Sequence, residues 1–588
     1  MDKNTLAGFG LLMVLLIAYI FYNQNAEIKH LEQRKADSIA QARLNPPKPI
    51  ANTTDSTFAP LASMDSNRNT IAHQTVVIEN EDIRIELSNY GAFPTSAQLK
   101  KYKTHLGKPL FLYKDGHSFD YAFNANDGRK IHSKDIAFDA QVSADQKSVT
   151  FTSNEIQFTY TIDDKGYMMR SQAKLLQASP NSDVQLQWTS RSLITEQDET
   201  SERLYTQVCY NLEKEGYDYF TIKDKETKKF SEAIKWLSFK QHYFNTTLIT
   251  DNKIISDGSV TTAMAPADTA LLPLSDFDAK LTLIPASEYN FKFFHGPNDY
   301  ALLKSYKIEL EELIPLSYGI FGFVKYINKW IIIPIFDALS SIFSSYGIVI
   351  LLLTFIIRLL MSPFTYKSYV SSAKMKALKP EIDELREKYG EDKQTFGVEQ
   401  MKLYRQAGVN PLGGCLPALL QLPVFFALLS FFPHAIELRQ ESFLWAKDLS
   451  TYDSILDLPF TIPFYGDHVS LFTILFVITS LLLSLYSMNM TADQSNPMMK
   501  YLPFIMPVMF LGIFNKLPAA LTYYYFVSNA ITLALQFVIQ NYIIDPDKIH
   551  AQIQAKKKEA PKESKFMKRM QEMQQQNAER MKKQQGKK

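Results

Sequence analysis

Arg358 is a cation inside a long apolar run, and Thr354 lies one helical turn away on the same face. An arginine that faces lipid near the bilayer centre costs at least about 2.5–3.5 kcal/mol. No Asp or Glu lies in any long apolar run, which argues against a proton relay built from carboxylates. Two interpretations stay open. Arg358 snorkels to the interface near Pro363, or it faces a water-filled cavity and attracts acidic residues of a passing polypeptide.

The last apolar run carries a stripe of polar side chains. They recur three or four residues apart and share one helix face: Tyr525, Ser528, Thr532 and Gln536. Gln421 lies within another run. Met488 belongs to a methionine cluster whose flexible thioethers suit promiscuous apolar contacts, although simple packing is the plainer explanation. Together these polar faces favour a water-filled cavity that opens toward the cytoplasm.

The elements that would position these residues are apolar runs about as long as a bilayer is thick. We predict six spans, at residues 6–22, 346–361, 412–432, 469–488, 498–514 and 517–544. No small-residue cleavage site follows the first, which favours an uncleaved signal anchor at 1–22 over a cleaved signal peptide. Residues 316–344 place Lys325, Asn328 and Lys329 on one stripe, which predicts an amphipathic helix lying in the interface.

The charges of the loops predict the topology. Residues 364–411 hold nine Lys or Arg and the tail 545–588 holds thirteen, whereas 433–467 carry six acidic residues against two basic ones. Basic loops stay in the cytoplasm. We therefore expect a multi-pass protein with both termini cytoplasmic and residues 23–344 outside.

Composition and the external region limit the other possibilities. The 588 residues include 63 Lys or Arg, 61 Asp or Glu and only two cysteines, which excludes a disulfide scaffold and a Cys-based zinc module. We expect no metal or cofactor. After a stalk at 23–74, strictly alternating runs predict an antiparallel β-sandwich at 75–315. A scaffold or docking role is favoured there, and a sugar-binding or glycosidase-like site is the alternative.

Two cytoplasmic features remain. Heptad-like spacing predicts an antiparallel helical hairpin at 364–411, with this seam: Met375, Leu378, Ile382, Leu385 and Tyr389. A hairpin of two such helices is marginal unless a partner holds it. The basic tail contacts either anionic lipid or RNA, and composition favours neither. Its candidate contacts are Lys556, Lys557, Lys558, Lys568 and Arg569.

Several motifs resemble the YidC/Oxa/Alb membrane protein insertases. They are the run 410–417 (NPLGGCLP) followed by Gln421 and Pro423, Thr354–Arg358, Lys374-Met375 and Tyr524–Asn529. The external region, with Phe293–Pro297, resembles the large periplasmic domain of the Gram-negative YidC branch. The resemblance covers nearly the whole chain.

The resemblance implies a polytopic α-helical membrane protein of the bacterial inner membrane. It implies a five-helix insertase core at 345–363 and 412–544, an interfacial helix and a periplasmic β-supersandwich. Such a protein passes hydrophobic segments of nascent proteins into the membrane, alone or with the Sec translocon, and is not an enzyme. The implied partners are nascent membrane proteins, the Sec translocon, lipids and, through the basic tail, the ribosome.

By the same resemblance, Arg358 matches the positive residue of the groove, and Thr354, Gln421 and Ser528 match its lining. Tyr525, with Tyr524 and Met488 beside it, is implied to contact substrate. Two other classes stay open. A transporter or channel would need inverted repeats and midplane charge pairs, which the sequence lacks. A lipid- or glycan-binding envelope protein would depend on the β domain instead.

Overall fold

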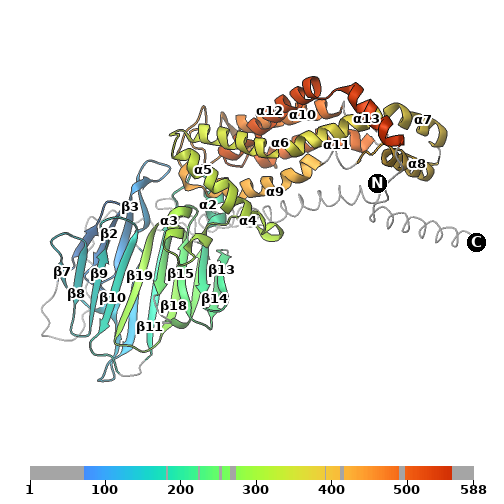
Figure 1. The fold of residues 1–588 in the computed structure, drawn as a ribbon. Helices are drawn as coiled ribbons and strands as arrows, with labels where there is room; N and C mark the ends of the chain where they lie inside the picture. The colour runs from blue at the N-terminus through green and yellow to red at the C-terminus, as the bar shows by residue number, and fades with distance from the viewer. Residues whose placement is uncertain are drawn as a thin grey trace, which may run out of the picture. The chain divides into compact units, whose positions relative to one another are not determined.

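The computed structural model describes residues 72–558, apart from 115, 180–182, 223–224, 251–254, 265–272, 391, 411–415 and 489–496. The predicted signal anchor and most of the stalk lie outside the described residues. The described chain forms two compact units that separate between Pro315 and Leu316, and residues 434–437 group with the first. Each unit is described below by itself (Figure 1).

The first unit is built from antiparallel sheets. In its described part the sheets have nine strands (β13-β12-β15-β16-β19-β10-β9-β8-β7), six strands (β14-β17-β18-β11-β5-β6) and four strands (β1-β2-β3-β4). The strands are β1 Thr75–Glu79, β2 Ile83–Ser88, β3 Pro94–Lys103, β4 Pro109–Lys114, β5 Ser118–Asn124, β6 Lys130–His132, β7 Asp139–Val142, β8 Ser148–Thr152, β9 Ile156–Ile162, β10 Met168–Leu175, β11 Val184–Leu193, β12 Gln207–Leu212, β13 Gly216–Thr221, β14 Glu226–Phe230, β15 Ile234–Lys240, β16 Phe244–Thr250, β17 Ile255–Met264, β18 Pro273–Leu283 and β19 Glu288–Pro297. Two short helices, α2 Glu199–Tyr205 and α3 Tyr300–Ser305, complete this unit.

Aromatic side chains join the two larger sheets. Phe293 of β19 contacts Phe119 of β5, with ring centroids 5.2 Å apart, and Phe239 of β15 stacks on Phe277 of β18 at 5.0 Å. The alternation of apolar and polar residues that predicted these strands also explains why the aromatic rings meet between the sheets, because successive side chains of a strand point to opposite faces. Along β9 every second residue is buried, starting at Ile156.

The second unit is helical. Its longer helices are α6 Tyr346–Ala377, α7 Lys379–Tyr389, α8 Lys393–Gln406, α9 Leu416–Phe431, α10 Leu471–Met488, α11 Pro497–Phe514, α12 Ala519–Val538 and α13 Pro546–Lys558. A hairpin of β20 Leu456–Ile462 and β21 Gly466–Val469 precedes α10. Within the described residues, two helices are long and apolar enough to cross a membrane, Tyr346–Ala377 and Ala519–Ile543. Shorter apolar helices correspond to the other predicted runs from residue 412 onward.

Helix α6 does not stop at Pro363, where we predicted the second span to end. The helix runs 32 residues, to Ala377. Proline lacks the N–H that would bond to the carbonyl of Leu359. The Ser362 hydroxyl donates to that carbonyl at 2.8 Å instead, so the acceptor is satisfied and the helix continues.

The segment predicted as an interfacial helix begins with a short turn at Gly319–Phe321 and then runs as one continuous helix over residues 324–340, made of α4 Val324–Ile327, a π-turn at Asn328–Ile332 and α5 Ile333–Ser340. Asn328 does not face the headgroup side with its lysine neighbours. It is fully buried, and its amide donates to the carbonyls of Leu316 and Ala427, both at 2.9 Å. A buried amide needs such partners, and finding them turns this side chain toward α9.

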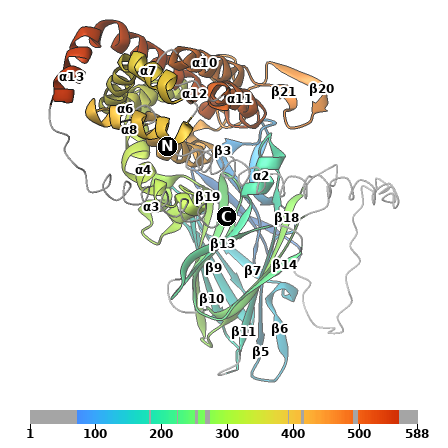
Figure 2. The ribbon, with the colours of Figure 1, turned by 90° about the vertical axis from the view of Figure 1, so that its right-hand side faces the viewer.

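The predicted hairpin exists, but it has a third helix. Helices α7, α8 and α13 gather at one end of the helical unit (Figures 1 and 2). Leu378 and Ile382 are buried with Leu403 and Tyr404 of α8. Ile549 and Ile553 of α13 enter the same cluster. Helix α13 is therefore the partner that covers the hairpin.

Candidate functional site

Arg358 connects α6 to α12. Its Nε donates a hydrogen bond to Ser528 Oγ at 2.7 Å, and its Nη2 donates to the same oxygen. Ser528 is fully buried, while Arg358 is partly exposed. A hydroxyl accepts hydrogen bonds without bringing charge. The guanidinium is thereby held in place and keeps its full positive charge.

Aromatic hydroxyls surround this charge. Arg358 interacts electrostatically with Tyr369 of α6 and with Tyr524 and Tyr525 of α12. Within the described part of the chain, no Asp or Glu forms an ion pair with Arg358. A charge out of water without an opposite charge is costly. The site is therefore suited to an acidic group arriving from outside.

Helix α9 supplies the third side of the site. The Tyr525 hydroxyl donates to the backbone carbonyl of Phe425 at 3.3 Å, and the two rings lie 5.4 Å apart. Tyr524 is fully buried, and its hydroxyl lies near Arg358 and Gln421 of α9 without a hydrogen-bond partner among the described residues. The structure thus brings four of the sequence-predicted residues, from α9 and α12, close to the guanidinium of a fifth, Arg358 of α6.

Three further predicted residues share these helices but direct their polar groups elsewhere. The Thr354 hydroxyl donates to Ile350 of its own helix at 2.6 Å, and Thr532 donates to the Ser528 carbonyl at 2.7 Å. Such back-bonding to the preceding turn is usual for threonine inside helices. Gln536 is buried, and its Oε1 has no hydrogen-bond partner among the described residues.

The remaining predicted contacts lie at the ends of helices or beyond them. Met488 ends α10, and its side chain lies outside the described residues, as do Lys568 and Arg569. Lys557 bonds with its Nζ to both carboxylate oxygens of Glu381 on α7. Its neighbour Lys556 packs beside Gly408, and the side chain of Lys558 is not described.

Sequence analysis missed the docking of α13. The sequence predicts only charge contacts for the basic tail from residue 545, with lipid or RNA. The first part of this tail nevertheless forms α13, a thirteen-residue amphipathic helix. Ile549 and Ile553, four residues apart, are 6% and 2% exposed. The four-residue spacing of these isoleucines is the sequence signal for an apolar helix face, and the many lysines nearby made it easy to overlook.

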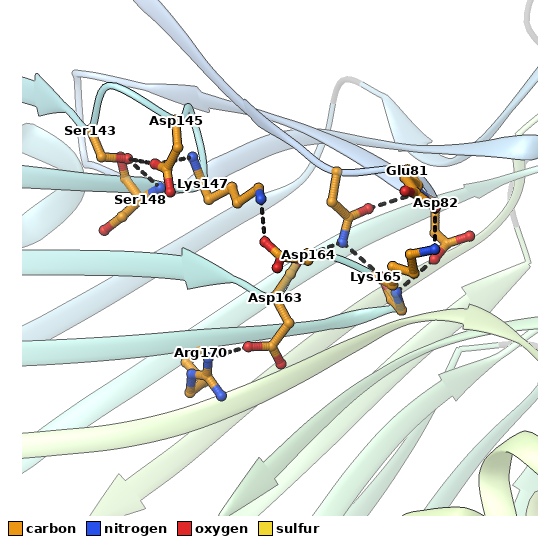
Figure 3. A network of polar contacts seen from close by, with 12 residues as sticks. Glu81, Asp82, Ser143, Asp145, Lys147, Ser148, Asp163, Asp164, Lys165 and Arg170 are labelled. Carbon is orange, nitrogen blue, oxygen red and sulfur yellow. Dashed lines mark hydrogen bonds and ion pairs between the residues drawn. The ribbon is translucent and has the colours of Figure 1, made fainter.

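Acidic residues of the β unit form a charged network at its surface, shown in Figure 3. Lys147 pairs with Asp164 and Arg170 pairs with Asp163 in the turn between β9 and β10. Lys165 of that turn also reaches Glu81, at 3.1 Å. These carboxylates already have cationic partners.

A glycosidase-like site would need two carboxyl groups free to act on a substrate. The network in Figure 3 instead joins neighbouring hairpin turns, and exposed pairs of this kind contribute at most about 1 kcal/mol each. No group of three or more potential metal ligands occurs within the described residues.

Two family models match the chain. The YidC periplasmic domain matches residues 75–336, and the 60Kd inner membrane protein matches residues 338–546. The membrane protein insertase YidC of Parabacteroides distasonis is 34% identical over 100% of this chain and 99% of its own length. The chain belongs to the YidC family of membrane protein insertases.

A second YidC, from Amoebophilus asiaticus, is 36% identical over 97% of this chain and 98% of its own. Among solved structures, an active YidC insertase with its first transmembrane domain resolved matches at 19% identity, with a TM-score of 0.33. That match covers 81% of this chain and 94% of the solved one. The family match over 338–546 contains Arg358 and all the residues gathered around it. The chain is thus a YidC-family protein with a β-rich periplasmic region and a helical insertase region.

Proposed function

We propose that this chain transfers hydrophobic segments of nascent proteins from the cytoplasm into the inner membrane, with Arg358 as the charge that receives them. The observation that carries the proposal is the pairing of Arg358 with a neutral hydroxyl of α12. A carboxylate partner would cancel the charge, whereas Ser528 positions it and leaves it available. No bond is made or broken in such a transfer, so the protein acts without covalent catalysis.

The groove would be formed by α6, α9 and α12. Gln421, Tyr524, Tyr525 and Ser528 line it around Arg358, because the structure gathers them there. Thr354, Thr532 and Gln536 would extend the same faces along α6 and α12, although in this structure the two threonine hydroxyls bond to their own helices. Met488 would offer an apolar contact at the end of α10.

The proposed topology has six spans. Residues 6–22 form the first, and α6, α9, α10, α11 and α12 form the insertase core. Both termini are cytoplasmic, and residues 23–344 are periplasmic and include a β-sandwich of the supersandwich type. The basic loop and tail support this orientation, since basic segments remain in the cytoplasm.

The partners follow from this placement. Nascent membrane proteins are the substrates, and the Sec translocon delivers some of them. The basic tail beyond α13 contacts ribosomal RNA or anionic lipid. Lys557 is paired with Glu381, so the proposal relies mainly on the other basic residues of the tail, among them Lys568 and Arg569.

Exchanging the charge at position 358 tests the proposal. Arg358→Lys keeps the charge and should largely preserve insertion. Arg358→Ala should slow the insertion of clients with acidic translocated segments roughly tenfold to hundredfold, since hydrogen bonds to a charged group contribute about 1.5–3 kcal/mol. Protease protection of a single-span client, in cells that contain only the variant, measures the effect.

Lys402→Ala is the matched control, because it removes a cation of α8 that pairs with Glu399 away from the site. Normal insertion of acidic clients by Arg358→Ala would refute the role of the charge. Equal loss in Arg358→Lys and Arg358→Ala would show that guanidinium geometry, and not charge, is what clients need.

A further inference from the structure

The hairpin of β20 and β21 projects from the helical unit beside α10 and α11 (Figure 2). Its apolar side chains are exposed: Phe464 at 79%, Phe460 at 61% and Leu456 at 57%. Nearly all of β20 is exposed on both faces. An antiparallel sheet in a soluble protein normally buries one face against a core. A hairpin this apolar and uncovered needs a partner surface.

The hairpin is held firmly in place by the end of α11. The fully buried Asn515 donates to the carbonyls of His468 at 2.8 Å and Tyr465 at 3.2 Å. Its own side-chain oxygen accepts from the amide of Ser470 at 2.9 Å. The Asn515 amide is therefore fully used in fixing the hairpin to the end of α11, from the turn at Tyr465 to Ser470 at its base.

Glycine at position 512 permits the closest contact. A Cβ atom there would lie 2.5 Å from the carbonyl oxygen of Phe464. The backbone at the hairpin tip thus lies directly against α11, while the Phe464 ring points away from the protein.

The hairpin continues an exposed apolar stripe of α11. Ile505, Val508 and Met509 are 58%, 57% and 42% exposed. With Gly512 they follow the spacing of a single helix face. In the proposed topology this stripe faces lipid, and the stripe ends where Phe464 and Phe460 begin. The hairpin therefore extends the same apolar surface.

The composition of the hairpin indicates how deep in a membrane it could lie. Residues 455–469 carry two carboxylates, Asp457, which accepts a hydrogen bond from Ser454, and Asp467, whose side chain is 65% exposed. Unpaired strand edges are not tolerated in the hydrocarbon core. Pro459 within β20 and Pro463 in the turn have no backbone N–H, so the hairpin has two fewer donors to satisfy. Aromatic, nearly uncharged segments of this kind suit the headgroup–acyl boundary.

We propose that the β20–β21 hairpin inserts into the headgroup–acyl boundary of the periplasmic leaflet and contacts phospholipid there. Both the leaflet and the lipid contact rest on the proposed topology, in which α11 spans the membrane. Lipid is the occupant because the surface continues a lipid-facing stripe, and residues 458–466, which include Phe460 and Phe464, contain no charged side chain of the kind that surrounds protein interfaces.

Quenching of a site-specific probe tests this. Phe464→Cys is labelled with an environment-sensitive NBD dye in the full chain with Cys209→Ser and Cys415→Ser, in nanodiscs of phosphatidylethanolamine and phosphatidylglycerol. We expect nitroxide at acyl carbon 5 to quench the dye at least twofold, carbon 12 to quench it less, and aqueous iodide to quench it weakly. Phe460→Cys, on the strand itself, should behave alike.

Val398→Cys on α8, which is 41% exposed, is the water-facing control and should respond to iodide only. Iodide quenching at 464 without lipid quenching would overturn the inference. Protection from both quenchers would indicate a protein partner and would overturn it equally.

Ile505→Cys on the α11 stripe separates this inference from the proposed function. Lipid quenching at 505 but not at 464 refutes the hairpin contact alone. Absence of lipid quenching at 505 refutes the span itself.

Discussion

The docking of α13 on the hairpin of α7 and α8 leads to a quantitative prediction. A thirteen-residue helix is marginal by itself in water. Its attachment depends on Ile549 and Ile553, because burying an isoleucine contributes about 1.5–3 kcal/mol. The Lys557–Glu381 pair, with side chains 22% and 34% exposed, adds at most about 1 kcal/mol. Truncating Ile553 therefore removes about half of the attachment energy.

We expect Ile553→Ala to make the opening of α13 more frequent. A loss of about 1.5–3 kcal/mol corresponds to roughly tenfold to 150-fold faster opening-limited amide exchange. Hydrogen exchange of the full chain, followed by mass spectrometry of peptides from α13, measures this directly. Peptides from α7 that contain Ile382 should also exchange faster, because α13 covers the same cluster.

Gln554→Ala is the matched control, since Gln554 is the next residue, exposed on the same helix. Both variants introduce alanine, which favours helix, so any difference reports the lost contact. Equal exchange in the two variants would refute the argument that these isoleucines hold α13. Faster exchange in α13 with no change in α7 would show that the hairpin is stable without it.

Further predictions concern the site, the β unit and the tail. Ser528→Ala should reduce the insertion of acidic clients a few-fold, as measured by protease protection. The loss should be smaller than in Arg358→Ala, because the charge of Arg358 remains and loses only its fixed orientation. An equal loss in the two variants would contradict this. Burial lowers the pKa of His117 and lowers that of His295 to about 3. A histidine in the unfolded chain has a pKa near 6.5, so below that pH the unfolded chain binds more protons than the folded one. The free energy of unfolding of the β unit should therefore fall as the pH drops below about 6.5, by up to about 1.4 kcal/mol per pH unit for each histidine. Acid unfolding followed by near-UV circular dichroism checks this, and an unchanged slope in His295→Phe would contradict it. Deleting residues 559–588 leaves α13 intact and should weaken ribosome co-sedimentation with a shallower salt dependence, and unchanged binding would leave lipid as the partner of the tail.

The strands and the apolar helices could be predicted because their signals are periodic and local. Alternation along residues 157–162 predicted a strand, and β9 occupies Ile156–Ile162. The spacing of Tyr525 and Ser528 predicted a shared helix face. The hydrogen bond between Ser528 and Arg358 does not follow from any local pattern, because the two residues are 170 positions apart and meet only through packing. Only the family resemblance assigned both residues to one groove.

The differences have equally specific causes. A proline usually ends a helix. In α6 the Ser362 hydroxyl donates to the carbonyl that the missing N–H of Pro363 would have bonded, and this depends on the rotamer of the serine side chain. Asn328 lies between the two lysines of its stripe in the sequence, yet its side chain turns inward because a buried acceptor lies on α9. Helix α13 was hidden by the charge of its surroundings. In each case a hydrogen bond or a contact with a remote segment overrode the local pattern.

The contacts of Arg358 bear on the two interpretations that the sequence left open. A snorkelling arginine extends along its own helix toward the interface and leaves its neighbours apolar. Here Nε and Nη2 both reach across to a buried hydroxyl on α12, and tyrosines of two helices surround the charge. Such convergence would be unnecessary for a side chain that only has to escape lipid. A neutral partner that orients a cation without cancelling its charge is the arrangement that a binding site for acidic segments requires.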